Sequence, residues 1–424
     1  MPLILLLVLL VLFSPLAIDI YLPAIPQMAE QLGAEVTLMQ GTITWFLFSM
    51  GLGQLLVGPL ADRYGRKPIA LGGVLLYGLS ALAAGFAASL GELMLARVLQ
   101  GFGACATSVA AFSVVRDSYG PKKSGQMISY LNGAICFIPA LAPLLGGWLT
   151  AKAGWSANFW FMAGYAAIVG SWLLWRMPET RPGETSSSGP LINWSRYSPV
   201  LRSPSFLFNA CLCMLAMAVI LAYVTAAPVQ LMVKLGLDMS GFSYWFTANA
   251  ALNILACFLA PRFIARVGPR RTLRIGLLVI TLSAMALTLV QHIDHPLAMM
   301  GPVFFSSIGF AMVLGAAAGM ALAPFGHCAG TAAALLGLFQ MSGSGALVGI
   351  TGWLMPDPLN QLALHMWLLL PPLLLLLTRQ GRRLCLQYIL CSDGHTQGAM
   401  SPLFFLQATS RLTLMTHRPV EKTG

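Results

Sequence analysis

The sequence predicts an all-α integral membrane protein, in which about twelve transmembrane helices form two six-helix bundles with pseudo-two-fold symmetry. Of its 424 residues, 58% are hydrophobic and 9% are charged, whereas a soluble globular chain carries about 25% charged residues. Apolar runs of about 20 residues, each long enough to cross a bilayer as a helix, recur along the chain. Two similar charged loops lie about half the chain apart, as an internal duplication would leave them. The runs are continuous rather than alternating, which argues against a transmembrane barrel.

The spans follow from the apolar runs. They are expected at residues 3–26, 38–60, 69–88, 91–115, 125–150, 156–176, 206–230, 242–263, 273–291, 298–323, 328–354 and 361–378. A polar stretch rich in proline, glycine and serine divides them six and six, and favours a flexible linker. Within it, a short interfacial helix is expected around Trp194 and Tyr197. The expected domains are a first bundle (1–176), a cytoplasmic linker (177–204), a second bundle (205–378) and an atypical cytoplasmic tail (379–424).

The basic residues predict the orientation of the chain. All but three of the 24 Lys and Arg residues lie at connections on one side of the predicted spans. Lys152 and Lys234 lie on the other side, and Arg97 lies within a span. By the positive-inside rule, both termini are expected in the cytoplasm. This placement explains the net charge of +11 without nucleic-acid binding.

A charged turn at residues 58–68, with the sequence GPLADRYGRKP, is the most informative short stretch of the chain. It holds more charges than a reversal between two membrane helices needs. A weaker copy, PRFIARVGPRR, lies at residues 261–271 and repeats the arginine, glycine and basic positions. The second copy has Ala265 in place of Asp62, so only the first copy keeps the full set of charges.

The first turn resembles the signature loop between helices two and three of the major facilitator superfamily, whose pattern G-x-L-A-D-R-x-G-R-K it matches almost completely. The resemblance implies the major facilitator fold. It also implies a charge cluster, at the cytoplasmic ends of helices two to four, that latches the outward-facing state. The residues expected in this latch are Gly58, Asp62, Arg63, Gly65, Arg66 and Asp117.

Asp19 is the only one of the 13 acidic residues that lies within a predicted span. An ionised carboxylate in a bilayer is costly, so a residue of this kind is a candidate for function. Burial favours its neutral form, which would let it take a proton from one side and release it to the other. A carboxylate at a helix end, wetted by the outer surface, is the alternative.

Residues 19–26, DIYLPAIP, resemble the first-helix motif of the Bcr/CflA drug-resistance transporters, which are drug:proton antiporters. The resemblance covers roughly residues 10–355 of the chain. Further matching stretches are RVLQGFG (97–103), RD (116–117), PETRP (178–182) and AGTAAA (329–334). The resemblance to this family implies proton-coupled export of chloramphenicol, bicyclomycin or related hydrophobic compounds across the bacterial inner membrane.

Arg97 is the second residue expected to take part in proton coupling. It is the only basic residue within a predicted span, and a buried guanidinium needs a partner or a polar cavity. The resemblance implies that an arginine on helix four contributes to proton coupling, and Arg97 is expected to lower the cost of an ionised carboxylate or a polar substrate nearby. Snorkelling to the outer surface is the alternative.

The fifth span resembles the antiporter motif of such transporters. Glycine and proline there allow close helix packing and a kink, as a hinge or gate requires. Ala142 stands where many exporters have glycine, and ordinary close packing is the alternative interpretation. The motif residues are Gly133, Pro139, Pro143, Gly146 and Gly147.

Aromatic rings and amides within the spans are candidates for lining a central cavity, since such walls suit apolar drugs with a few polar groups. Plain helix packing is the alternative for each of them. The candidates are Tyr21, Trp45, Phe46, Tyr130, Asn132, Asn249, Asn253 and Gln340.

The leading hypothesis is proton-coupled multidrug efflux by alternating access, by a monomer and not by an enzyme. Its expected partners are drug molecules, protons and the bilayer. No cofactor or metal is expected, because the sequence has no G-x-x-x-x-G-K-[ST] motif for ATP and its cysteines lack metal-ligand spacing. The alternatives are a proton-coupled exporter of a metabolite such as a sugar or amino acid, a membrane enzyme such as an acyltransferase, and a non-functional product.

Overall fold

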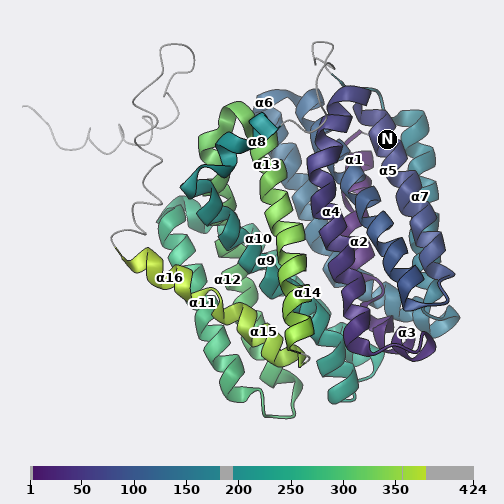
Figure 1. Ribbon diagram of the computed structural model, residues 1–424, viewed down its shortest axis with the longest axis vertical. Helices are drawn as coiled ribbons and strands as arrows, with labels where there is room; N and C mark the ends of the chain where they lie inside the picture. The colour runs from purple at the N-terminus through teal and green to yellow at the C-terminus, as the bar shows by residue number, and fades with distance from the viewer. Residues whose placement is uncertain (1–2, 182–193, 356, 379–424) are drawn as a thin grey trace, which may run out of the picture. The chain divides into compact units, whose positions relative to one another are not determined.

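The computed structural model describes residues 3–181, 194–355 and 357–378, and within these residues the chain forms helices and no strands (Figure 1). The first half contains α1 (Leu3–Val11), α2 (Phe13–Asp19), η1 (Leu22–Ala24), α3 (Ile25–Gln31), α4 (Val36–Tyr64), α5 (Arg66–Gly85), α6 (Leu90–Ala153) and α7 (Ser156–Arg176). The second half contains α8 (Trp194–Leu201), α9 (Pro204–Pro228), η2 (Val229–Lys234), α10 (Met239–Val267), α11 (Pro269–Val290), α12 (Pro296–Leu322), η3 (Ala323–Cys328), α13 (Ala329–Leu338), η4 (Phe339–Gly343), α14 (Ser344–Leu354), α15 (Pro358–Trp367) and α16 (Leu370–Leu377).

Twelve segments of the described residues are long and apolar enough to cross a membrane. They match the expected spans in order, but several of them run further than the apolar runs, and in two of these the extension takes in an acidic residue. Asp62 lies in the span Leu38–Tyr64 and Asp117 in the span Leu90–Tyr119, although both were expected in connections. Both carboxylates pair with Arg66, and this compensation of charge lets the helices continue to their charged ends.

Helix α6 covers two spans, and the chain must reverse direction within it. Arg97 and Gly146 both lie against the stretch Ala17–Ile20 of the first span. A straight helix would separate these two residues by about 70 Å, at 1.5 Å per residue. The two spans of α6 are therefore neighbours, Leu90–Tyr119 and Gly133–Ala153.

The first span is broken next to Asp19, where α2 ends and η1 begins. Pro23 follows Asp19 by four residues, and since proline has no N–H it cannot donate the helical hydrogen bond to the Asp19 carbonyl. The N–H of Ala24 bonds the Tyr21 carbonyl instead of continuing the α-helical pattern to Ile20. The sequence therefore opens the backbone at the one acidic residue in the middle of this span.

Helices of the first half pack mainly on α6, and those of the second half pack on α12 and α9. Between the halves, α4 lies alongside α13 and α14 (Figure 1), and α6 contacts α10. Hydrogen bonds cross between the halves here. Gln40 Nε2 donates to the Thr225 carbonyl at 2.7 Å, Ser342 Oγ donates to the Phe48 carbonyl at 2.5 Å, and Thr247 Oγ1 donates to the Ala140 carbonyl at 2.9 Å.

The domain boundaries and the cytoplasmic linker stay predictions. The helix expected around Trp194 and Tyr197 is present as α8, and Tyr197 Oη donates to the Leu55 carbonyl. The rest of the linker, residues 182–193, and the tail, residues 379–424, lie outside the described residues.

Candidate functional site

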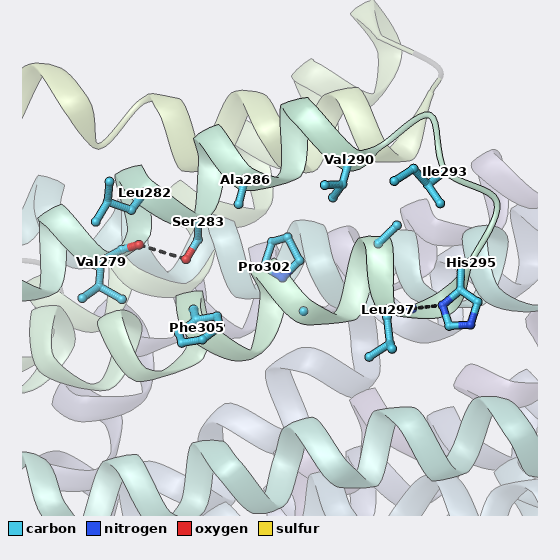
Figure 2. A pocket seen from close by; sticks show the side chains of 12 residues that line it. Val279, Leu282, Ser283, Ala286, Val290, Ile293, His295, Leu297, Pro302 and Phe305 are labelled. Atoms are coloured by element: carbon cyan, nitrogen blue, oxygen red, sulfur yellow. Dashed lines mark hydrogen bonds between the residues drawn. The ribbon is translucent and has the colours of Figure 1, made fainter.

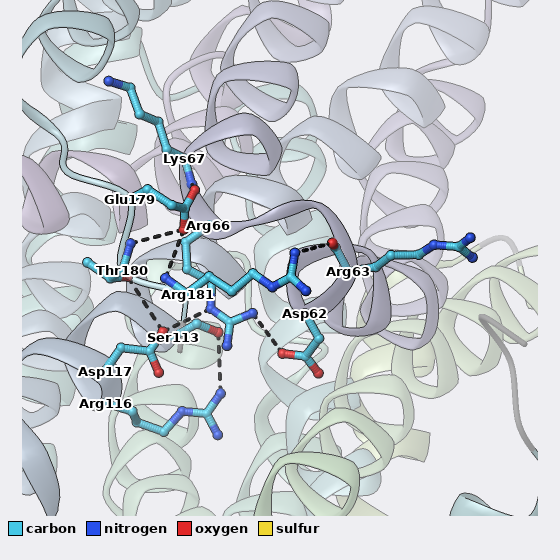
Figure 3. Close-up of polar contacts among 10 residues, drawn as sticks. All are labelled: Asp62, Arg63, Arg66, Lys67, Ser113, Arg116, Asp117, Glu179, Thr180 and Arg181. Carbon is cyan, nitrogen blue, oxygen red and sulfur yellow. Dashed lines mark hydrogen bonds and ion pairs between the residues drawn. The ribbon is translucent and has the colours of Figure 1, made fainter. Parts of the chain in front are cut away.

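Arg66 is the centre of a charge cluster at one end of the spans (Figure 3). Its side chain is 5% exposed, and its guanidinium bonds Asp62 Oδ1 at 2.7 Å through Nη1 and Asp117 Oδ2 at 2.9 Å through Nε. Asp117 is 13% exposed and Asp62 is 55% exposed. The structure thus brings together three of the four charged side chains that the sequence analysis grouped in the latch, from α4, α5 and α6.

Gly65 makes the turn that places Arg66. Its φ of 104° and ψ of 162° end α4 and begin α5, in a region of backbone conformation open in practice only to glycine. A Cβ on Gly65 would also lie 2.5 Å from Glu179 Oε2. The side chain of Arg63 is exposed and does not join the cluster. A Cβ on Gly58 would meet no atom within 4 Å, so the packing seen here does not require that glycine.

Glu179 completes the cluster, and the sequence analysis did not give it a role. Its Oε1 accepts from the backbone N–H of Arg66 at 2.9 Å, and its Oε2 accepts from that of Lys67 at 3.1 Å. Glu179 therefore caps the N-terminus of α5, where helices leave N–H groups unpaired. The sequence offered one signal for this role: Glu179 is the acidic residue of the PETRP stretch, which directly follows the sixth span.

The pKa of Glu179 is set by two opposing causes. Partial burial acts to raise the pKa of its carboxyl, but backbone N–H groups of Arg66, Arg181, Lys67 and Thr180 donate to it and leave its pKa below the ordinary value of 4.5. Arg181 also donates through Nη1 to the Arg63 carbonyl at 2.6 Å. The chain after α7 is thus tied to the signature loop at two points.

Asp19 lies in the interior, beside the break in the first span. It is 4% exposed, and its carboxylate makes no hydrogen bond or ion pair with the described residues. A carboxylate held in this way is stabilised by whatever can neutralise it, whether a proton or a positively charged group. The wetted helix end that was the alternative does not fit its burial.

Arg97 is fully buried, and its partners are the broken backbone and aromatic rings rather than Asp19. Nη2 donates to the Ala17 carbonyl at 2.8 Å, and Nη1 donates to Gln100 Oε1 at 2.6 Å. The guanidinium carbon lies 4.4 Å from the ring centre of Phe46 and 4.9 Å from that of Tyr21. Such cation–π contacts stabilise a cation that has no carboxylate partner, and Nε has no partner among the described residues.

A polar group on the second half, which the sequence analysis only partly found, lies near Asp19. Ser307 Oγ donates to Asn249 Oδ1 at 2.9 Å. Tyr223, on α9, has its phenol near Asn249 and within electrostatic range of Asp19, yet its oxygen makes no hydrogen bond of ordinary geometry. Asn249 was expected to bind substrate; Tyr223 and Ser307 were not identified, because nothing in the sequence shows which helices face Asp19.

The motif of the fifth span lies against both the first span and α10. A Cβ on Gly146 would overlap the carbonyl oxygen of Ile20, so only glycine allows this approach. Gly147 faces Met239, and Gly133 faces Phe258, both on α10. Pro139 and Pro143 lie within α6 between these contacts.

The remaining cavity candidates differ in their surroundings. Tyr21 and Phe46 are fully buried, and Tyr21 Oη shares a hydrogen bond of 2.8 Å with Thr42 Oγ1. Trp45 is 47% exposed and Tyr130 is 56% exposed. The others are part-buried or not described: Asn253 accepts from Cys257, Gln340 lies in η4, and the side chain of Asn132 lies outside the described part of the chain.

A family model described as Major Facilitator Superfamily matches residues 7–348. The multidrug resistance protein MdtL of Escherichia coli is 33% identical over 351 residues, which cover 81% of this chain and 88% of that protein. The protein of the same name from Shewanella oneidensis is 32% identical over 357 residues, covering 84% of this chain and 89% of its own length.

Solved structures with the same arrangement of helices include a D-xylose-proton symporter, with a TM-score of 0.68 and 15% identity, covering 86% of this chain and 96% of that one. A bacterial homologue of the human lysosomal transporter Spinster has a TM-score of 0.66 and 16% identity, covering 93% and 97%. At these identities the likeness concerns the fold alone. It confirms the predicted fold class of two helical bundles with about twelve spans.

Proposed function

Because the chain belongs to the major facilitator superfamily, a family of multi-pass membrane transporters and not of enzymes, we propose that it exports hydrophobic drug-like compounds in exchange for protons. The observation that carries this proposal is Asp19, a carboxylate 4% exposed and without a hydrogen-bond partner among the described residues. The relatives named as multidrug resistance proteins support the substrate class. The DIYLPAIP motif supports the Bcr/CflA type.

In this proposal Asp19 alternates between a proton and the transported compound. A proton from outside neutralises the carboxylate, the compound leaves outward, and the proton is then released inside. Arg97 contributes by holding the Ala17 carbonyl at the break of the first span, which keeps Asp19 in place through the cycle. A membrane potential supplies about 2.3 kcal/mol per charge per 100 mV, so one or two protons can drive a sizeable gradient of the compound.

The proposed substrate site lies where the two halves face each other around Asp19. Tyr21 and Phe46 of the first half and Asn249 of the second are buried in this state, and we propose that they meet the compound when the halves separate. Apolar walls with a few polar groups bind compounds of mixed character. Trp45 and Tyr130, exposed in this state, are proposed to face the compound in another state of the cycle.

The cluster around Arg66 is proposed as the latch on the cytoplasmic side, in the orientation that places both termini in the cytoplasm. Since breaking a pair to a buried charge is costly, the closed arrangement is held until the helices separate. Release of the latch would open the inside, giving two alternating states.

Proton flux in energised inside-out vesicles tests the proposal, with a pH-sensitive dye and a panel of chloramphenicol-like, cationic and sugar compounds. A hydrophobic compound is expected to dissipate the proton gradient with the unaltered protein, and Asp19→Asn is expected to reduce this to the level of vesicles without the protein. Asp238→Asn is the matched control, because Asp238 is an exposed helix cap and asparagine caps equally well. Flux that persists in Asp19→Asn would overturn the role of Asp19.

The same vesicles test the latch and the alternative substrate class. Asp62→Asn is expected to slow the flux and to shift the populations of the two states; if both stay unchanged, the latch proposal fails. A response to the sugar or to an added amino acid, with none to the drugs, would favour a proton-coupled exporter of a small metabolite.

A further inference from the structure

A groove of about 590 Å³ lies between α11 and α12, away from Asp19 and from the charge cluster. Figure 2 shows side chains of both helices pointing into it. Its walls are almost wholly apolar: Val279, Leu282, Ala286 and Val290 come from α11, and Pro302 and Phe305 come from α12. Transport as proposed above does not use this groove.

The sequence explains why the groove forms at this end of the two helices. At their other end they approach closely, because a Cβ on Gly276 would lie only 2.9 Å from the carbonyl oxygen of Gly309. Towards the connection at residues 291–295, Ala286, Ala298 and Gly301 are too small to fill the space between the helices. A Cβ on Gly301 would meet no atom within 4 Å.

The location and length of the groove indicate a hydrocarbon chain. Both helices are membrane spans, and Leu282 and Phe305 at its edges are 50% and 65% exposed, so it opens towards the lipid. From Val279 to Val290 a helix rises about 16 Å, at 1.5 Å per residue. The hydrocarbon of one leaflet is about 15 Å thick, half of the bilayer core. The length of the groove therefore matches that of one acyl chain in one leaflet.

The polar end of the groove has groups that suit a phosphate. His295 Nδ1 accepts the N–H of Leu297 at 3.1 Å and caps α12. In the neutral ring Nε2 then carries the hydrogen and can donate it to a phosphate oxygen. The N-terminus of the 27-residue α12 adds a partial positive charge. Asp294, exposed beside His295, favours a headgroup that also carries an ammonium.

We propose that this groove binds one acyl chain of a bilayer phospholipid, whose phosphate lies at His295. The site is independent of the proposed transport function, because none of its residues lies near Asp19 or the charge cluster. If this site exists, α11 and α12 bind a phospholipid at a defined position, whereas other lipid-facing helices contact the bilayer without a defined site.

Native mass spectrometry of the full chain, purified in a mild detergent, tests the site by counting retained phospholipid. Gly301→Leu is expected to fill the groove and lower the occupancy about tenfold, which corresponds to losing roughly two buried methylene groups. Gly319→Leu is the matched control, on the same helix, also with no atom within 4 Å of a Cβ and outside the groove. It is expected to retain lipid as the unaltered protein does.

His295→Ser is a second variant, in an exposed connection, in case Gly301→Leu folds poorly. Serine keeps a helix-cap acceptor but removes the imidazole donor, so lower occupancy with an unchanged melting temperature is expected. Adding vesicles of phosphatidylethanolamine or of phosphatidylglycerol before purification identifies the headgroup, and the first is expected to bind better. Equal occupancy in Gly301→Leu and Gly319→Leu would overturn the proposal, as would an adduct that is a transported compound or a second copy of the chain.

Discussion

At Gly65 one residue decides whether the charge cluster can form. The turn needs its positive φ, and the space beside it is taken by Glu179. The two requirements, one of the backbone and one of the neighbouring carboxylate, fall on the same Cβ position. Glycine is the only residue that meets both.

Gly65→Ala is therefore expected to lower the stability of the protein. The backbone strain alone costs about 1–3 kcal/mol, and the overlap with Glu179 adds to it. Gly58→Ala, seven residues earlier inside α4, is the control: its Cβ has free space, and alanine in a helix interior is favoured over glycine by about 0.5–1 kcal/mol. Thermal melting in detergent compares the two, and equal melting temperatures would show that the turn tolerates a side chain.

Asp19 and Arg97, the two residues assigned to proton coupling, do not bond each other directly. Both were expected to take part in proton coupling, and both lie at the break of the first span, but Arg97 bonds the Ala17 carbonyl and not the carboxylate. Pro23 and Pro26 predict that the Asp19 and Leu22 carbonyls lose their helical donors, and the resulting end of α2 leaves the carbonyls of its last turn, Ala17 among them, in need of other donors. Which side chain would satisfy them is decided only by the packing of α6 against the first span.

At the scale of elements, Glu179 joins the end of α7 to the start of α5. The carboxylate meets N–H groups at a helix N-terminus, where negative charge is favoured by about 0.3–1 kcal/mol. Because its pKa lies below the ordinary value of 4.5, the ionised form is more stable in the folded protein than in the unfolded chain. Its contribution is therefore fully present above pH 4.5 and is lost as the pH falls through the folded-state pKa.

Glu179→Gln is expected to lower the melting temperature at neutral pH, and the difference from the unaltered protein is expected to shrink as the pH falls below 4.5. Melting curves in detergent over a range of pH measure it. Glu30→Gln is the control, because the exposed side chain of Glu30 makes no hydrogen bond with the described residues. A difference that stays constant with pH would mean that the charge of Glu179 does not matter.

For the whole molecule, the distribution of basic residues predicts the orientation in the membrane. Tyr64, beside the charge cluster, is 57% exposed, and Asn360 is exposed in the first turn of α15, at the start of the last span. The positive-inside rule predicts that the first lies in the cytoplasm and the second outside.

Labelling of intact cells with a membrane-impermeant maleimide tests this orientation. Asn360→Cys is expected to react above the background of the eight native cysteines, and Tyr64→Cys is expected to react only after the cells are opened. The reverse pattern would invert the orientation, and with it the assignment of the latch to the cytoplasmic side.

The sequence by itself determined the number and order of the spans, the charged turn at Gly65 and the carboxylate of Asp19 in the middle of the first span. These are local properties, because the length of an apolar run, a glycine at a tight turn and a lone charge within a span can each be read without knowing any neighbour. Only the tertiary structure decided that Glu179 caps α5, that Arg97 binds a freed carbonyl, that Tyr223 lies near Asp19, and that α11 and α12 leave a groove. Each of these depends on contacts between residues far apart in the chain, and helices in a bilayer can pack in many ways around the same apolar surfaces.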